Sequence, residues 1–141
     1  MVDTPMSSNE TGTSEPRRAM VVDDSRAMRL ILRRMLNECG FRVSEAGNGR
    51  EAIDRLSAGE KAELVMVDWN MPELNGYEFI QMVRAERAFD GVRLVMVTTE
   101  TEMHQVSKAL EAGADEYIMK PFTREVIQDK LALIGLGAAE S

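Results

Sequence analysis

Five polar side chains stand directly after apolar runs of strand length, and together they suggest phosphoryl chemistry at a carboxylate. Asp23 and Asp24 follow one such run, and Asp68 and Thr98 each follow another. Lys120 ends a shorter run and precedes a proline. If these runs are parallel strands of one sheet, the side chains meet at one edge of it, where ligands bind in such proteins. That edge then gathers carboxylates, a hydroxyl and an ammonium group.

Carboxylates this close repel one another, and a hard divalent cation with oxygen ligands, such as Mg²⁺, removes the repulsion. One carboxylate can then attack a phosphoryl donor, because phosphoryl transfer needs mainly positioning and charge neutralisation. Asp68 stands alone at its strand end and is the best acceptor, while the adjacent Asp23 and Asp24 are suited to hold the metal. Lys120 would neutralise one phosphoryl oxygen, and the Thr98 hydroxyl would donate a hydrogen bond to another.

Each of these residues also has an ordinary structural explanation when it is considered alone. Asp24 or Ser25 is well placed to cap a following helix, and Thr98 could do the same. Single charges such as Asp68 and Lys120 at strand ends are usually exposed to water. The functional interpretation rests on their joint position at one predicted edge.

The apolar pattern predicts the strands that must position these side chains. Residues 20–22, 64–67 and 94–97 are continuously apolar, as in strands covered by helices on both faces. Residues 42–46 alternate and residues 116–119 are mixed, which is typical of strands nearer an edge. Because helical segments separate the runs, the sequence predicts an α/β fold with a parallel sheet.

Helical periodicity and capping residues predict the intervening helices. A first helix has an apolar face from Met28 to Cys39 and stops at Gly40. We expect Asn48 with Glu51 to cap a second helix, and a third to begin after Asn75-Gly76. The last two are predicted to start at Thr99 or Thr101, with a stop at Gly113, and at Thr123.

The ordered motifs of this chain resemble those of response-regulator receivers, in particular the CheY-like members. They are Asp23-Asp24, Asp68-Trp69-Asn70-Met71-Pro72, Thr98-Thr99-Glu100 and Lys120-Pro121-Phe122. The resemblance implies a flavodoxin-like, doubly wound, five-stranded parallel sheet flanked by five helices. Its strand order, 2-1-3-4-5, is that of CheY itself and follows here from the resemblance alone.

The resemblance also implies a role for each site residue. Asp68 is the phosphorylated residue. The direct ligands of Mg²⁺ or Mn²⁺ are expected to be Asp24, Asp68 and the backbone carbonyl of Asn70, with Asp23 acting through water. A cis bond is expected between Lys120 and Pro121.

In receivers, a hydroxyl and an aromatic ring form the switch, and these correspond to Thr98 and Tyr117. The readout is expected on the surface of the fourth helix, fifth strand and fifth helix, where a protein effector binds. Asn70 and Glu100 flank the path of the attacking water and are expected to influence the phosphoryl lifetime. Motor-binding chemotaxis members tend to carry lysines where this chain has Glu102 and Met103, which argues against the flagellar motor as the partner.

Composition limits the remaining possibilities. The 141 residues are 44% hydrophobic and 29% charged, which suits one core. We expect a flexible tail at 1–17, a receiver domain at 18–135 and a short tail at 136–141. The formal charge of −7 argues against nucleic-acid binding, and no apolar run approaches the roughly 20 residues of a membrane span. The lone Cys39 cannot form an internal disulfide, so we expect a cytoplasmic protein. We also expect a monomer.

The leading prediction is therefore a stand-alone response regulator of a chemotaxis-type two-component system, a signalling switch and not an enzyme. A histidine kinase or a histidine phosphotransfer protein would supply the phosphoryl group. A phosphorelay intermediate or phosphate sink would use the same chemistry and stays open as an alternative. A phosphatase of the haloacid dehalogenase type is disfavoured, because Asn70 stands where such enzymes need a general acid.

Overall fold

The computed structural model describes residues 16–137, which form a five-stranded parallel sheet. The strand order is β2-β1-β3-β4-β5, so the predicted order is confirmed. The strands are β1 (Arg17–Val22), β2 (Phe41–Ala46), β3 (Leu64–Asp68), β4 (Arg93–Thr98) and β5 (Glu116–Met119).

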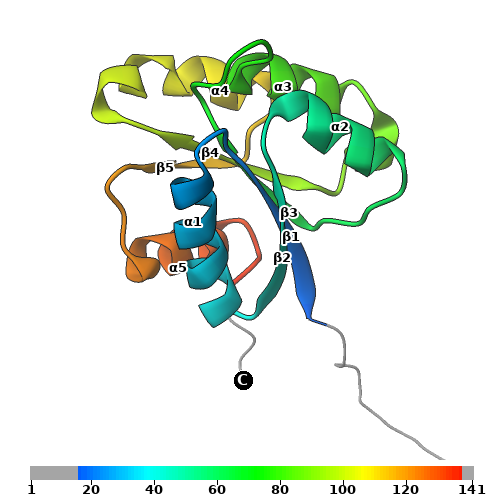
Figure 1. Ribbon diagram of the computed structural model, residues 1–141. Coiled ribbons are helices and arrows are strands. Elements are labelled where there is room, and N and C mark those ends of the chain that lie inside the picture. The colour runs from blue at the N-terminus through cyan, green and yellow to red at the C-terminus, as the bar shows by residue number, and fades with distance from the viewer. Residues whose placement is uncertain (1–15, 138–141) are drawn as a thin grey trace, which may run out of the picture.

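Helices cover both faces of this sheet (Figure 1). On one face lie α1 (Arg26–Glu38) and α5 (Arg124–Leu133), and on the other α2 (Gly49–Ser57), α3 (Gly76–Arg84) and α4 (Val106–Ala112). Short 3₁₀ segments, η1 (Arg87–Phe89) and η2 (Glu100–Gln105), precede β4 and α4. Within residues 16–137, each helix is too short or too polar to cross a lipid bilayer.

The continuously apolar strands lie at the centre because both of their faces are buried. Along β1, Met20 and Val22 belong to the core beneath α2, α3 and α4, whereas Ala19 and Val21 belong to the core beneath α1 and α5. All five residues of β3 are buried. Burial on both faces explains why these runs do not alternate.

Most predicted helix ends agree with the structure. Ser25, Asn48, Asn75 and Thr123 accept hydrogen bonds from backbone amides of the helices that follow them. At α2, however, Glu51 accepts from the Gly47 amide at 2.9 Å, and not from the expected cap residue. Gly40 and Gly113 end α1 and α4 with positive φ angles of 97° and 123°, which glycine adopts at little cost.

The start of the fourth helix differs from the prediction. Thr99 is the cap, but it opens the 3₁₀ segment η2, and regular α-helix begins only at Val106. At the N-terminus, β1 begins at Arg17, inside the predicted tail, and most of that tail lies outside the described residues. Residues 138–141 of the predicted C-terminal tail also lie outside them.

Candidate functional site

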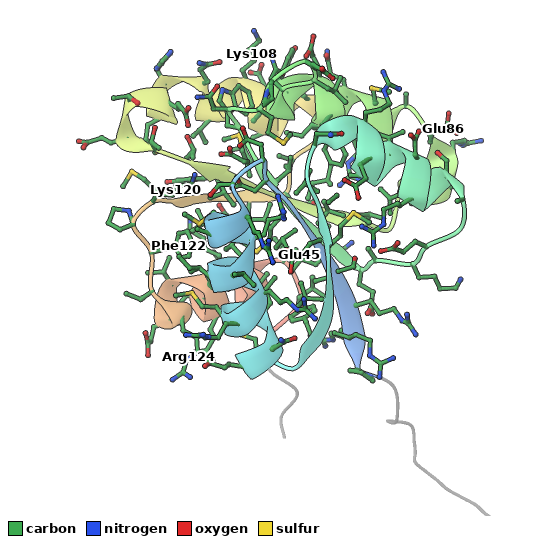
Figure 2. All side chains as sticks on the ribbon, viewed as in Figure 1. Glu45, Glu86, Lys108, Lys120, Phe122 and Arg124 are labelled. Carbon is green, nitrogen blue, oxygen red and sulfur yellow. The ribbon has the colours of Figure 1, made fainter. Side chains whose placement is uncertain are left out.

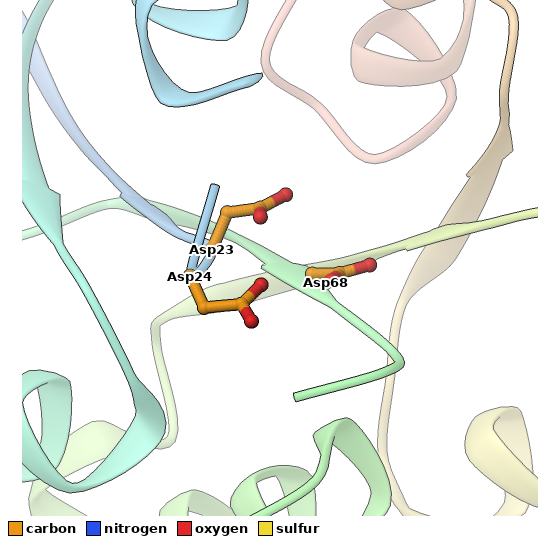
Figure 3. Close-up of side chains that lie close together, drawn as sticks. All are labelled: Asp23, Asp24 and Asp68. Atoms are coloured by element: carbon orange, nitrogen blue, oxygen red, sulfur yellow. The ribbon is translucent and has the colours of Figure 1, made fainter. Parts of the chain in front are cut away.

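Three carboxylates meet where β1 and β3 end side by side. In the pairing of these strands Val22 lies opposite Val67, so the residues that follow them come together. Carboxylate oxygens of Asp23, Asp24 and Asp68 all lie within 4.8 Å of one another. Figure 3 shows the three side chains at the C-terminal ends of the two strands, with Asp68 as the last residue of β3. The sequence prediction that these separated segments converge is therefore confirmed.

Two of the three carboxylates are deeply buried, and burial dominates their electrostatics. Asp23 is 1% exposed and Asp68 is 6% exposed, whereas Asp24 is open to water. Burial, together with the nearby charge of Asp23, raises the pKa of Asp68 to about 6. Burial also raises the pKa of Asp23, although a hydrogen bond from the Ser25 amide opposes the shift. The site therefore disfavours its own negative charge when no cation is bound.

The hydrogen bonds of Asp23 fit a cation site. Its Oδ1 accepts from the Ser25 amide at 2.8 Å. Its Oδ2 is buried and has no hydrogen-bond partner among the described residues. An orphaned buried carboxylate oxygen is costly, and a metal ion or a metal-bound water satisfies it. With Asp24 exposed to solvent, the cluster has the oxygen donors and the water access that Mg²⁺ or Mn²⁺ requires.

Lys120 brings a positive charge to the same edge. Its Nζ lies 3.5 Å from Oδ1 of Asp68, and its backbone amide donates to the Thr98 carbonyl at 2.7 Å. The peptide bond between Lys120 and Pro121 is cis, as the resemblance implied. Figure 2 labels Lys120 and Phe122 on the segment that joins β5 to α5, beside α1. Lys120 is therefore held next to the carboxylate cluster through the end of β4.

Thr98 is fully buried at the end of β4, but its hydroxyl points to a partner that the sequence did not suggest. The Oγ1 atom lies 3.2 Å from the Thr99 carbonyl and 3.2 Å from Oε1 of Glu102. In the sequence Glu102 stands out only by its charge. The signal that could have found it is the pattern Thr99-x-x-Glu102, a capping box that draws the carboxylate back toward the strand end.

The remaining predicted residues lie around this centre. Tyr117 is half-buried in β5, and Lys130 of α5 places its Nζ 4.0 Å from the centre of the tyrosine ring. The same ammonium lies 3.2 Å from the Glu116 carboxylate. Asn70 and Glu100 are both exposed. Nothing in these contacts brings Tyr117 to the carboxylates, so its predicted role depends on movement.

The raised pKa of Asp68 predicts a specific pH dependence in the metal-free protein. A folded-state pKa of about 6 against an unfolded value of 3.8 means that ionised Asp68 destabilises the fold above pH 6. The penalty, on the order of 3 kcal/mol, is relieved as the pH falls through 6 toward 4. Urea unfolding in EDTA should therefore show Asp68→Asn to be more stable than wild type at pH 7.5, with the difference shrinking by pH 4.5. A pH-independent difference between the two would contradict the raised pKa.

Comparisons with known proteins agree with this geometry. Residues 19–132 match the family model of the response regulator receiver domain. A chemotaxis protein CheY homolog of Campylobacter jejuni is 44% identical over 123 residues, covering 86% of this chain and 95% of its own. The chemotaxis protein CheY1 of Helicobacter pylori strain J99 is 41% identical over 116 residues, covering 82% of this chain and 94% of its own.

Solved structures give the same answer for the fold. The chemotaxis response regulator CheY4 of Vibrio cholerae superposes with a TM-score of 0.77 at 28% identity, covering 85% of this chain and 99% of its own. The family match covers most of the chain. The strand order and the clustered acidic residues of the structure support the same family independently of that match. The chain belongs to the response regulator receiver domain family.

Proposed function

We propose that this chain is a chemotaxis-type response regulator that accepts a phosphoryl group on Asp68 and thereby changes its affinity for a protein partner. The observation that carries the proposal is the buried Asp68 carboxylate, which lies beside two further carboxylates and 3.5 Å from the Lys120 ammonium. A desolvated carboxylate that a cation can neutralise is suited to attack a phosphoryl donor and to retain the product. The CheY relatives described above support the chemotaxis assignment.

In the proposed reaction, a carboxylate oxygen of Asp68 bonds to the phosphorus as the bond to the donor's leaving group breaks. Lys120 lies within reach of that carboxylate and would pair with a phosphoryl oxygen. A bound Mg²⁺ or Mn²⁺ supplies charge neutralisation of the phosphoryl oxygens. Asp24, Asp68 and the backbone carbonyl of Asn70 would hold the ion directly, and Asp23 would hold it through water. Asn70 and Glu100, both exposed, would modulate how long the phosphoryl group survives.

The proposed switch is formed by Thr98 and Tyr117. Movement of the Thr98 hydroxyl toward a phosphoryl oxygen would free space behind it for the tyrosine ring. The Lys130 ammonium over that ring would have to release it, which links the movement to α5. The surface formed by α4, β5 and α5 would then present a different shape to a protein effector.

The setting of this switch is also part of the proposal. A histidine kinase or histidine phosphotransfer protein would supply the phosphoryl group in the cytoplasm. The receiver domain, predicted at 18–135, would begin one residue earlier, where β1 starts at Arg17. A chain that only stored or relayed the phosphoryl group would need the same acceptor but no change on the surface of α4, β5 and α5. That difference separates the two possibilities by experiment.

The test is nuclear magnetic resonance of the ¹⁵N-labelled protein with Mg²⁺, before and after addition of beryllofluoride, a mimic of the phosphoryl group. We expect amide shifts at Thr98 and Tyr117 and along α4, β5 and α5, because the switch couples the site to that surface. The same addition to Asp68→Asn should leave these amides unchanged. Shifts confined to the loops that carry the three aspartates would favour the relay or sink over the binding switch.

A further inference from the structure

The Thr98 hydroxyl is held by a carboxylate that is not part of the phosphoryl site. Its Oγ1 lies 3.2 Å from Oε1 of Glu102, and Thr98 is fully buried. A hydroxyl has one proton and can donate it to one acceptor at a time, or share it between two close ones. Here the available acceptors are the Thr99 carbonyl and Glu102, both on the segment that leads away from β4.

Glu102 is itself fixed in place, so this contact is not that of a freely moving surface side chain. The same Oε1 accepts from the Thr99 amide at 3.0 Å, and the Glu102 amide donates to the Thr99 carbonyl at 3.0 Å. The bond from the Thr99 amide to the Glu102 side chain is the glutamate half of the capping box that opens η2. Glu102 is half-buried, which limits the competition from water. One carboxylate therefore ties the strand-end hydroxyl to the first turn of the segment before α4.

We infer that Glu102 is a positioning residue that holds the switch in its unphosphorylated state by binding the Thr98 hydroxyl; this inference rests on the proposed function. A phosphoryl group on Asp68 must compete with an ionised carboxylate for the same proton. A hydrogen bond to a charged acceptor is about twice as strong as a neutral one. The bond to Glu102 therefore makes the free energy of moving the hydroxyl to the phosphoryl group less favourable. When the hydroxyl leaves, η2 loses one of the three hydrogen bonds that join Glu102 to Thr98 and Thr99.

We call the hydrogen bond between the Thr98 hydroxyl and the Glu102 carboxylate the latch. It predicts that beryllofluoride binds more tightly when the charge of Glu102 is removed. In Glu102→Gln the amide oxygen can still accept from the Thr99 amide, so the cap is retained, but its bond to the hydroxyl is weakened. With saturating Mg²⁺, we expect beryllofluoride to bind this variant about three- to tenfold more tightly than wild type. Trp69, the only tryptophan of the chain, follows Asp68 directly and serves as the fluorescent reporter.

A double-mutant cycle separates the latch from a simple effect of local charge. In Thr98→Val there is no hydroxyl to hold, so adding Glu102→Gln should change the beryllofluoride affinity by less than about twofold. Glu111→Gln removes the same charge from an exposed position of α4 and should leave the affinity at the wild-type value. Circular dichroism confirms that each variant is folded.

The outcomes distinguish this inference from the function on which it rests. Tighter beryllofluoride binding in Glu102→Gln that disappears in the Thr98→Val background supports the latch. An equal gain in both backgrounds, or no gain while wild type binds normally, overturns the latch and leaves the proposed function standing. If wild type does not bind beryllofluoride in the presence of Mg²⁺, the proposed function and the latch both fail.

Discussion

Asp68→Asn is expected to lose phosphoryl uptake from acetyl phosphate, with a fall in the amount of modified protein on the order of 100-fold or more. The carboxylate that would attack phosphorus is replaced by an amide of nearly the same shape. The fold should persist, because the substitution removes a buried charge whose pKa is already raised to about 6. Intact-protein mass spectrometry after incubation with Mg²⁺ measures the phosphorylated fraction.

Asp90→Asn provides the matched control for this variant. Asp90 is exposed and directly follows η1. Its substitution also replaces one carboxylate with an amide. Its phosphorylated fraction should equal that of wild type. If Asp68→Asn were modified to the wild-type extent, Asp68 could not be the acceptor and another nucleophile would have to be sought.

Asp24→Asn is expected to weaken Mg²⁺ binding by about 10- to 100-fold, the range seen even when an outer-shell partner is lost. Asp24 is the exposed member of the carboxylate cluster, so its replacement leaves the buried core intact. Titration of Trp69 fluorescence with Mg²⁺ measures the dissociation constant. Phosphoryl uptake should fall at low Mg²⁺ and recover in part at high Mg²⁺, because the acceptor itself is unchanged.

The control for the metal prediction is Asp54→Asn on the exposed face of α2. It lowers the negative charge of the protein by the same amount without touching the cluster. Equal Mg²⁺ affinity in wild type and Asp24→Asn would show that the cation is held elsewhere. Equal weakening in both variants would show that Mg²⁺ responds only to the overall charge.

The sequence predicted the sheet well because a strand that is buried on both faces consists almost entirely of apolar residues. The run at 64–67 is apolar throughout, and the structure buries every residue of β3. The short run at 116–119 coincides with β5. The convergence of Asp23, Asp24 and Asp68 also followed from the sequence, because the C-terminal ends of parallel strands share one edge. The strand order had a different origin, since it came from the family resemblance and not from periodicity.

What the sequence did not predict depends on the exact path of the backbone. Thr99 was one of two possible caps, but the 3₁₀ geometry of η2 depends on how that segment packs after β4. The contact between Thr98 and Glu102 requires this turn, so spacing alone did not distinguish Glu102 from an ordinary surface charge. The pKa of about 6 for Asp68 likewise depends on burial and on its distance from Asp23. Both features arise from the three-dimensional packing of the folded chain.

The most direct test of the central claim is to locate the phosphoryl group on wild-type protein. After incubation with acetyl phosphate and Mg²⁺, borohydride reduction converts an aspartyl phosphate to homoserine, and peptide mass spectrometry then identifies its position. The proposed function predicts homoserine at position 68, with none formed when EDTA replaces Mg²⁺. Homoserine at another aspartate, or an unchanged yield at position 68 in EDTA, would contradict it.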